Sequence, residues 1–271
     1  MSDVTKAIIL ARGLGTRMRK HSDDATLSAE QQAAANAGTK GLINVGRPFL
    51  DYILSALADV GVTDICLVIG PEHNAFRDYY DSLDLQRVRI HYAIQEKPLG
   101  TADALAAARE FQGDDRAIVL NSDNYYPPEG LAALVACPGS ALVGFERDAM
   151  VAEGNIAADR IKAFAVVDVE GEGDQAVLKG IVEKPDDATL AAMADAPVSM
   201  NCWLFTAAIQ DECAKVTPSP RGELELIDAV AALAKTEPIR VVRCARGVLD
   251  MSNQDDIPAV AAALKGVDVR L

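Results

Sequence analysis

A glycine-rich segment near the N-terminus combines residue types that could bind phosphate. Residues 10–17, with the sequence LARGLGTR, directly follow an apolar run. Gly13 and Gly15 let backbone N–H groups approach an anion closely, because glycine adopts positive φ at little cost. Arg17 adds a planar guanidinium that matches phosphate oxygens. The spacing fits neither the dinucleotide fingerprint nor the P-loop, so it indicates a phosphate loop of another kind.

Two further segments could contribute to a nucleotide site. Asp123 ends the apolar run 119–123, and an acid at the carboxyl end of a buried strand faces the crevice where open α/β sheets bind ligands. Mg²⁺ accepts carboxylate and phosphate oxygens together, although Asp123 could also be a turn or N-cap residue. Gln95 begins QEKPLGTA, and its amide offers a donor and an acceptor to a pyrimidine edge. A plain Pro-Gly turn is the alternative there.

The elements that must position these residues alternate between strand and helix, which predicts an α/β fold. Residues 161–169 and 176–182 are expected to form a β-hairpin with its tip near 171–174. The other expected strands are 4–10, 64–69, 88–93, 117–121, 140–146, 200–206 and 239–244. The expected helices are 48–60, 102–111, 129–136 and 255–265. We expect one domain over 1–271, since a chain of this length can bury one large core.

Composition excludes several classes of function. The net charge is −14, from 26 basic and 40 acidic residues, which disfavours binding to nucleic acid but not to one nucleotide with Mg²⁺. The five cysteines are odd in number and form no C-x-x-C pair, so neither a zinc site nor a disulfide framework is indicated. No signal peptide and no apolar stretch of membrane-spanning length is found. We therefore expect a cytoplasmic protein without a membrane partner.

Several segments, in order from Leu10 to Asp250, resemble the sugar-1-phosphate nucleotidyltransferases, in particular the glucose-1-phosphate uridylyl- and thymidylyltransferases. Residues 10–18 resemble the family's L-A-x-G-x-G-T-R-[LM]. Residues 95–102, 183–185 and 221–226 resemble its Q-x-x-P-x-G-T-a, E-K-P and g-E-x-x-L segments. The resemblance implies a doubly wound, Rossmann-like fold of the nucleotidyltransferase type. In it a mostly parallel sheet carries helices on both faces and a small β-hairpin insertion.

The resemblance also implies roles for individual residues. The catalytic set is Arg17, Lys40, Asp123 and Lys184. The nucleotide set is Leu10, Ala11, Gly13, Gly15, Thr16, Gln95, Gly100 and Thr101. The sugar set is Glu183, Asn201 and Glu223, although Glu223 could instead be an acid at a helix start. Asp123 and Asp250 are implied to hold Mg²⁺ as the cofactor.

The implied reaction is attack of a sugar 1-phosphate on the α-phosphorus of an NTP, which releases pyrophosphate and forms an NDP-sugar. UTP or dTTP is the favoured nucleotide, because Gln95 is implied to contact the pyrimidine base. One alternative is a regulatory protein that binds a nucleotide or sugar nucleotide without turnover. Its support comes from departures at Arg12, Ser122 and residues 251–253. A second alternative is a cytidylyltransferase for a phosphorylated alcohol. The sugar, the choice between UTP and dTTP, and the oligomeric state stay open.

Two departures from the family pattern carry expectations of their own. Residues 19–39 form a longer connector than the family has, polar at first and alanine-rich later. We expect a mobile cover over the triphosphate, because long loops in compact domains often act as lids. A fixed helix used for packing is the alternative. Trp203 stands where many members have glycine and could reshape the sugar pocket.

Overall fold

The computed structural model describes residues 4–13, 18 and 27–271, in which strands and helices alternate along the chain. The strands are β1 (Lys6–Leu10), β2 (Asp64–Ile69), β3 (Arg89–Ile94), β4 (Ala117–Asn121), β5 (Asn124–Tyr125), β6 (Ser140–Phe145), β7 (Ala165–Glu170), β8 (Val177–Val182), β9 (Val198–Phe205), β10 (Ile239–Cys244) and β11 (Leu249–Asp250). The α-helices are α1 (Ala29–Ala37), α2 (Phe49–Asp59), α3 (Asn74–Tyr80), α4 (Thr101–Ala107), α5 (Arg109–Gln112), α6 (Pro128–Ala136), α7 (Arg147–Glu153), α8 (Asp187–Ala192), α9 (Ala208–Cys213), α10 (Leu226–Leu233) and α11 (Asp256–Ala263). The 3₁₀ helices are η1 (Lys40–Leu42), η2 (Ala158–Ala163) and η3 (Gly173–Gln175).

Nine strands of the described chain form one sheet in the order β3-β2-β1-β4-β9-β6-β10-β8-β7. The first four strands are mutually parallel, and β6 is parallel to β10. Strand β9 runs antiparallel between β4 and β6, and β7 and β8 are antiparallel to each other. Strand β7 also pairs with β9, so β9, β6, β10, β8 and β7 close into a ring. The α/β class is confirmed, with a parallel first half and a mixed second half of the sheet.

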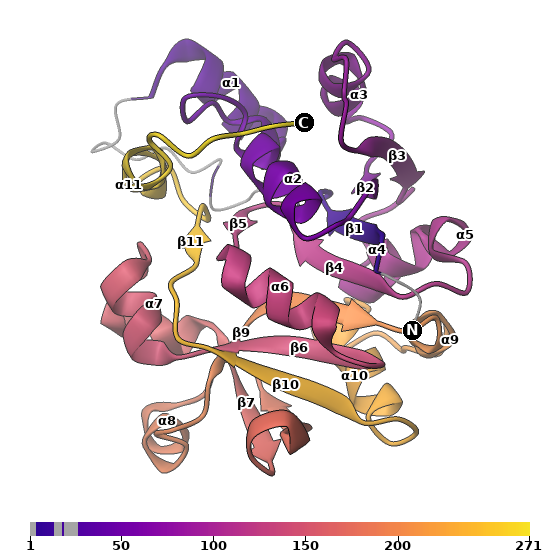
Figure 1. Ribbon diagram of the computed structural model, residues 1–271, viewed down its shortest axis with the longest axis vertical. Coiled ribbons are helices and arrows are strands. Elements are labelled where there is room, and N and C mark those ends of the chain that lie inside the picture. The colour runs from indigo at the N-terminus through magenta and orange to yellow at the C-terminus, as the bar shows by residue number, and fades with distance from the viewer. Residues whose placement is uncertain (1–3, 14–17, 19–26) are drawn as a thin grey trace.

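Alternate side chains of the strands enter two apolar cores, one on each face of the sheet. On β1, Ala7 and Ile9 belong to one core and Ile8 to the other. The first core also contains the apolar faces of α2, α6 and α11, and the second those of α4, α9 and α10. Figure 1 shows the sheet running through the molecule with helices packed on either side. This arrangement leaves the ends of the strands as the place where a ligand can approach.

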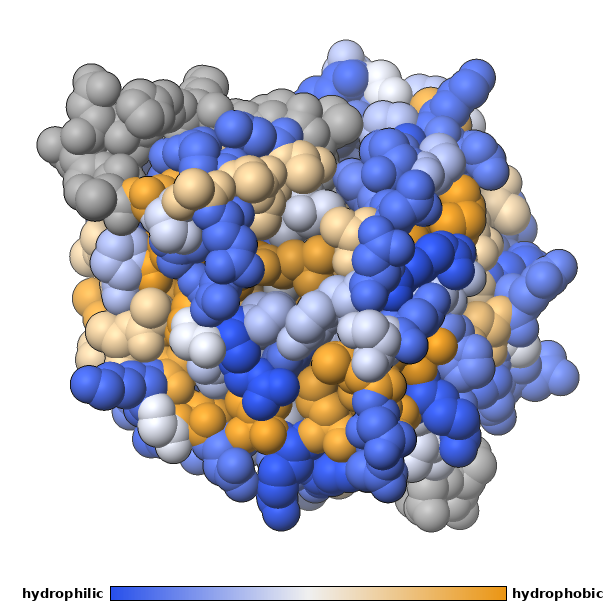
Figure 2. Space-filling view, turned by 90° about the horizontal axis from the view of Figure 1, so that it is seen from above, coloured by the Kyte–Doolittle hydropathy of each residue, from blue (hydrophilic) through white to orange (hydrophobic). Residues whose placement is uncertain are grey.

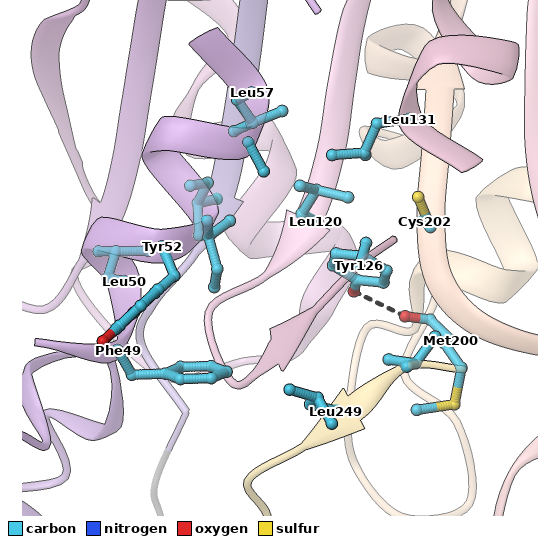
Figure 3. Close-up of a cluster of buried hydrophobic side chains, with 14 of the residues drawn as sticks. Phe49, Leu50, Tyr52, Leu57, Leu120, Tyr126, Leu131, Met200, Cys202 and Leu249 are labelled. Carbon is cyan, nitrogen blue, oxygen red and sulfur yellow. Dashed lines mark hydrogen bonds between the residues drawn. The ribbon is translucent and has the colours of Figure 1, made fainter. Parts of the chain in front are cut away.

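Part of the first core is drawn in Figure 3, where side chains from distant segments converge. Tyr126 and Phe49 come from different elements and are both fully buried. The Tyr126 hydroxyl donates a hydrogen bond to the Met200 backbone oxygen at 2.7 Å. Because a buried hydroxyl without a partner is costly, this bond lets a polar group lie inside the core. It also joins the chain after β5 to β9, which carries part of the site.

The sequence predicts most strands to within a few residues, but several other elements differ in an informative way. The helix expected over 102–111 is interrupted at Ala108, between α4 and α5. The first hairpin strand begins at Ala165 instead of residue 161, because residues 158–163 form the 3₁₀ helix η2. Helices α3, α7, α8, α9 and α10 were not expected. Each has eight residues or fewer, too short for a clear periodic pattern.

The alanine-rich half of the long connector forms helix α1. Ser28 and Gln31 make a reciprocal capping box at its start, and Gly38 ends it in a left-handed conformation. The Gln31 side chain also donates to the Asn44 backbone oxygen at 2.6 Å, and Ala35 is fully buried. These contacts favour a packed helix for residues 29–37. The polar half of the expected cover, residues 19–26, lies outside the described residues.

Hydrophilic residues predominate on the face drawn in Figure 2, with apolar residues in smaller groups between them. This surface suits a chain with a net charge of −14. Within the described ranges, no helix is both long enough and apolar enough to cross a membrane.

Candidate active site

A cleft of about 540 Å³ opens where β1, β3 and β4 end and α4 begins. It brings together residues from six separate segments of the chain. The described members of the predicted nucleotide set all line it: Leu10, Ala11, Gly13, Gln95, Gly100 and Thr101. Lys40, Asp123 and Glu223 line it as well. The remaining predicted residues of the glycine-rich loop, Gly15, Thr16 and Arg17, lie outside the described residues.

A smaller hollow of about 180 Å³ adjoins this cleft. Glu183, Asn201 and Asp250 line it, which are two members of the predicted sugar set and the second predicted metal ligand. Asn121, Asp123 and Ser252 line both spaces. Asp123 therefore stands at the junction of the cleft and the hollow.

The structure separates some residues that the sequence groups together. Glu223, predicted in the sugar set, lines the cleft and not the smaller hollow. Lys184 lines neither space, although it directly follows Glu183. Lys184 and Asn201 both have positive φ, 46° and 54°, which is uncommon for residues other than glycine. Such strained backbone at two positions beside one hollow points to a functional site.

Lys40 and Asp123 form an ion pair inside the cleft, with Lys40 Nζ 2.8 Å from Asp123 Oδ2. The 3₁₀ helix η1 begins at Lys40, and Asp123 follows the carboxyl end of β4. The two side chains are 15% and 24% exposed, so both are shielded yet open to a ligand. A cation and a carboxylate thus meet at the point where cleft and hollow join.

Asp250 is 2% exposed and is held by a dense set of hydrogen bonds. Its Oδ1 accepts from Asn124 Nδ2 at 3.0 Å and from Ser252 Oγ at 2.8 Å. Its Oδ2 accepts from Arg160 Nη2 at 2.7 Å, while Arg160 Nη1 binds Asp256 at 2.8 Å. Arg160 is a site residue that the sequence did not indicate, because no local pattern connects η2 with β11. Its guanidinium fixes the orientation of Asp250.

The pKa of Asp250 is raised from 3.8 to about 6, most of all by burial and next by the negative charge of Asp123. The bonds from Ser252 and Arg160 act in the opposite direction. The interaction with Asp123 means that the two carboxylates act on each other across the junction. The oxygens of two carboxylates that repel each other suit a hard divalent cation, which can bind phosphate oxygens at the same time. Within the described ranges, no group of three or more His, Cys, Asp or Glu side chains gathers as a metal site, so a cation at this junction would also need ligands from its substrate.

We expect ionisation of Asp250 to destabilise the metal-free fold. The folded protein holds this proton more tightly than the unfolded chain does, so the stability that it contributes is lost as the pH rises through about 6. Asp250→Asn removes the titration. Its free energy of unfolding relative to the wild type should therefore rise by up to about 3 kcal/mol between about pH 4 and about pH 7. Urea unfolding with a chelator present measures this, and a difference that does not change with pH would contradict it.

The amide of Gln95 has a fixed orientation in the cleft. Gln95 Nε2 donates to the Gly100 backbone oxygen at 3.0 Å and to Asp103 Oδ2 at 2.8 Å. Both partners are acceptors, so the amide nitrogen must face them and the amide oxygen must face away. The oxygen is then an acceptor for an N–H group of a ligand. Asp103 is a second residue that the sequence analysis missed.

Gly100 and Thr101 serve the site by joining the start of α4 to the segment before α10. A Cβ at Gly100 would lie 2.3 Å from the Leu224 backbone oxygen, and its φ is 130°, so only glycine fits. Thr101 Oγ1 accepts from the Leu226 N–H at 2.9 Å. These contacts hold Glu223, which lies in the same segment, against the cleft.

Charged groups beyond the predicted set surround Glu183. Burial raises the pKa of Glu183, and Glu225 raises it further, while Arg221 and Lys184 lower it. Arg221 also binds Glu225 with Nε and Nη2 at 3.1 and 2.6 Å. Arg221 is the first residue of the segment 221–226, so its place in the sequence was the available signal. Two cations therefore lie close to the sugar-side carboxylate.

Trp203 does not line either space. It is 1% exposed, stacks on Phe205 with ring centroids 5.3 Å apart, and belongs to the second core. Its Nε1 donates to Asn201 Oδ1 at 3.4 Å. Any influence of Trp203 on a ligand in the hollow would thus pass through Asn201.

A crevice at the carboxyl ends of parallel strands, with an ion pair and a second, buried carboxylate, defines an α/β protein with a ligand site at the edge of its sheet. The chain belongs to the nucleotidyl transferase family, whose pattern matches residues 6–264. The match includes every strand and helix described above.

Individual proteins are similar over most of the chain. The low-salt glycan biosynthesis nucleotidyltransferase Agl11 of Haloferax volcanii is 29% identical over 235 residues, which cover 84% of this chain and 57% of Agl11. The glucose-1-phosphate thymidylyltransferase of Streptomyces griseus is 28% identical over 230 residues, which cover 83% of this chain and 56% of that enzyme. This chain therefore spans little more than half the length of these two relatives.

A crystal structure of a UDP-glucose pyrophosphorylase in complex with UDP-glucose has the same fold. It superposes with a TM-score of 0.72, and the match covers 97% of this chain and 98% of that one at 16% identity.

Proposed function

We propose that this chain is a sugar-1-phosphate nucleotidyltransferase that forms an NDP-sugar and pyrophosphate from an NTP and a sugar 1-phosphate. The observation that carries the proposal is the position of Asp123 between two adjoining spaces. A reaction that joins a nucleotide to a sugar phosphate needs two pockets that share one charged junction. The names of the similar proteins, a glucose-1-phosphate thymidylyltransferase and a UDP-glucose pyrophosphorylase, support the same substrate classes.

The chemistry that we assign to the residues is positioning and charge neutralisation. The phosphate of the attacking sugar 1-phosphate is already ionised, so the reaction needs no strong general base. Lys40 neutralises charge on the triphosphate, and Arg17 is assigned the same task from the sequence alone. Lys184 orients the attacking phosphate, while Glu183 and Asn201 bind sugar hydroxyls. Glu223 lines the cleft, so we assign it to bind the part of the sugar that lies nearest the nucleotide.

Asp123 and Asp250 are the residues that would hold Mg²⁺, since hard carboxylate oxygens from two sides of the junction fit that ion. Bound there, Mg²⁺ would lower the charge on the α-phosphate. Lys40 already supplies one positive charge to Asp123 at 2.8 Å. Arg160 holds Asp250 in its orientation at the opposite side.

The fixed amide of Gln95 supports UTP or dTTP as the nucleotide. Uracil and thymine carry an N3–H donor, which a glutamine oxygen accepts, whereas cytosine has an unprotonated acceptor at the same ring position. A site built around one donor rejects bases that leave its groups unpaired. This argument also disfavours the cytidylyltransferase alternative.

A matrix of the four NTPs against common sugar 1-phosphates, with Mg²⁺ and a pyrophosphate-release readout, tests the proposal. We expect turnover with UTP or dTTP, and kcat/KM lower by at least about a hundredfold with ATP, GTP or CTP. Nucleotide binding without pyrophosphate release from any pair would favour a regulatory protein. Equal or better kcat/KM with a purine nucleotide or with CTP would contradict the assignment of the base.

A further inference from the structure

Arg12 crosses the carboxyl ends of three neighbouring strands and lines the cleft. It follows β1, and its side chain is only 7% exposed. Its Nη1 donates a hydrogen bond to the backbone oxygen of Gln95, which follows β3. Its Nη2 lies 3.3 Å from Glu72 Oε1, in the loop after β2. One guanidinium thus connects the ends of β1 and β2 to Gln95, the residue proposed above to recognise the base.

The path of Arg12 depends on a glycine at position 70. A Cβ at Gly70 would lie 2.6 Å from Arg12 Nε and 2.5 Å from Glu72 Oε2, so any larger residue would displace the guanidinium or the carboxylate. Arg12 Nε is buried and has no hydrogen-bond partner. A buried donor without a partner costs free energy, which a residue selected for stability alone would avoid.

The bond to Gln95 is more consequential than the ion pair. The Glu72 side chain is 56% exposed, and an ion pair with so exposed a partner contributes little stability. The bond to the Gln95 oxygen lies on the buried side of Arg12 and involves a charged donor, which strengthens it. Gln95 is therefore fixed at three points: its backbone N–H donates to the Ile69 oxygen, its backbone oxygen accepts from Arg12, and its amide nitrogen donates to Gly100 and Asp103.

We propose that Arg12 is a positioning residue for base selection, which holds Gln95 so that its amide oxygen meets the N3–H of uracil or thymine. The proposal rests on the function proposed above and deepens it. A guanidinium carries only donors, so it occupies the Gln95 backbone oxygen and leaves the amide oxygen as the acceptor for the base. When Arg12 is absent, the Gln95 N–H keeps its bond to the Ile69 oxygen but the Gln95 carbonyl loses its partner, so the peptide can tilt and the amide can rotate to offer its nitrogen to cytosine N3. Discrimination between uracil and cytosine should then fall.

The test compares Arg12→Met with a matched control, Glu72→Gln. Arg12→Met keeps length and apolar packing but loses every donor, whereas Glu72→Gln weakens only the exposed ion pair. For Arg12→Met, we expect the ratio of kcat/KM for UTP to that for CTP to fall by at least about tenfold, with the loss in KM for UTP and kcat within about twofold. Glu72→Gln should keep the wild-type ratio. Calorimetric Kd values for UTP and CTP with Mg²⁺ should change in the same way.

Each outcome of this test decides for or against the proposal. An unchanged UTP-to-CTP ratio in a folded Arg12→Met protein overturns it, as does an equal loss of ratio in Glu72→Gln. If Arg12→Met does not fold, Arg12→Lys replaces it, since lysine keeps the charge but not the reach to Gln95. If the wild type releases no pyrophosphate, the proposed function fails, and the calorimetric ratio still decides the role of Arg12.

Discussion

Asp123→Asn is expected to lower kcat by at least about a hundredfold in Mg²⁺, the scale for removing one electrostatic contributor from an active site. The substitution removes a charge with almost no change in volume. Asp123 is the charged residue that lines both the cleft and the smaller hollow, and its carboxylate pairs with Lys40 at 2.8 Å. Its loss therefore affects the nucleotide side and the sugar side together. Pyrophosphate release at saturating concentrations of both substrates measures the effect.

The control for this variant is Asp114→Asn, which removes an exposed aspartate in the turn after α5. It should keep wild-type kcat, because a screened surface charge has little influence on the site. Thermal unfolding of both variants checks that each is folded. Near-normal turnover of a folded Asp123→Asn protein would show that this carboxylate has been assigned wrongly.

Lys40→Met should lower kcat/KM for the nucleotide by at least about a hundredfold, because a shielded cation that neutralises phosphate charge is lost. The same change should tighten Mn²⁺ binding in the absence of nucleotide. Lys40 is the one hydrogen-bond or ion-pair partner of the Asp123 carboxylate that the described part of the chain provides, and a metal ion must compete with it. Electron paramagnetic resonance of free Mn²⁺ measures the affinity independently of turnover.

Lys179→Met serves as the matched control, since Lys179 is 62% exposed and pairs with Asp168 on the hairpin. Neither kcat/KM nor Mn²⁺ affinity should change in it. Weaker Mn²⁺ binding in Lys40→Met would mean that the lysine supports the metal site instead of competing for it.

The elements around the cleft were predictable because their signals are local. Strands β2, β4 and β10 have the predicted bounds, since each is a short apolar run between turn residues. The cleft residues Gln95 and Asp123 were also predictable, because each directly follows such a strand. Parallel strands then bring their carboxyl ends to one edge of the sheet without further information.

The missed parts of the site depend on contacts between distant segments. Arg160 reaches Asp250 across 90 residues of sequence. It lies in the 3₁₀ helix η2, which extends into the region where the sequence predicts the hairpin strand to begin. The split between Glu223 and the other sugar-set residues likewise follows from the way residues 224–226 are bonded to α4. The buried position of Trp203 was not predictable, because Asn201 has left-handed backbone and breaks the alternation of β9.

The closed ring of strands in the second half of the sheet has a consequence for association between chains. An unpaired strand edge invites another chain to add a strand, and the ring reduces such edges, with β10 and β8 joined at Arg240 and Val177. In the described part of the large sheet, β3 is the one strand with a neighbour on a single side. Strand β3 begins at Arg89, whose side chain is 70% exposed and pairs with Asp64 of β2, and charged residues of this kind discourage edge-to-edge pairing. We therefore expect copies of this chain that assemble to meet through helices and loops more readily than through a shared sheet.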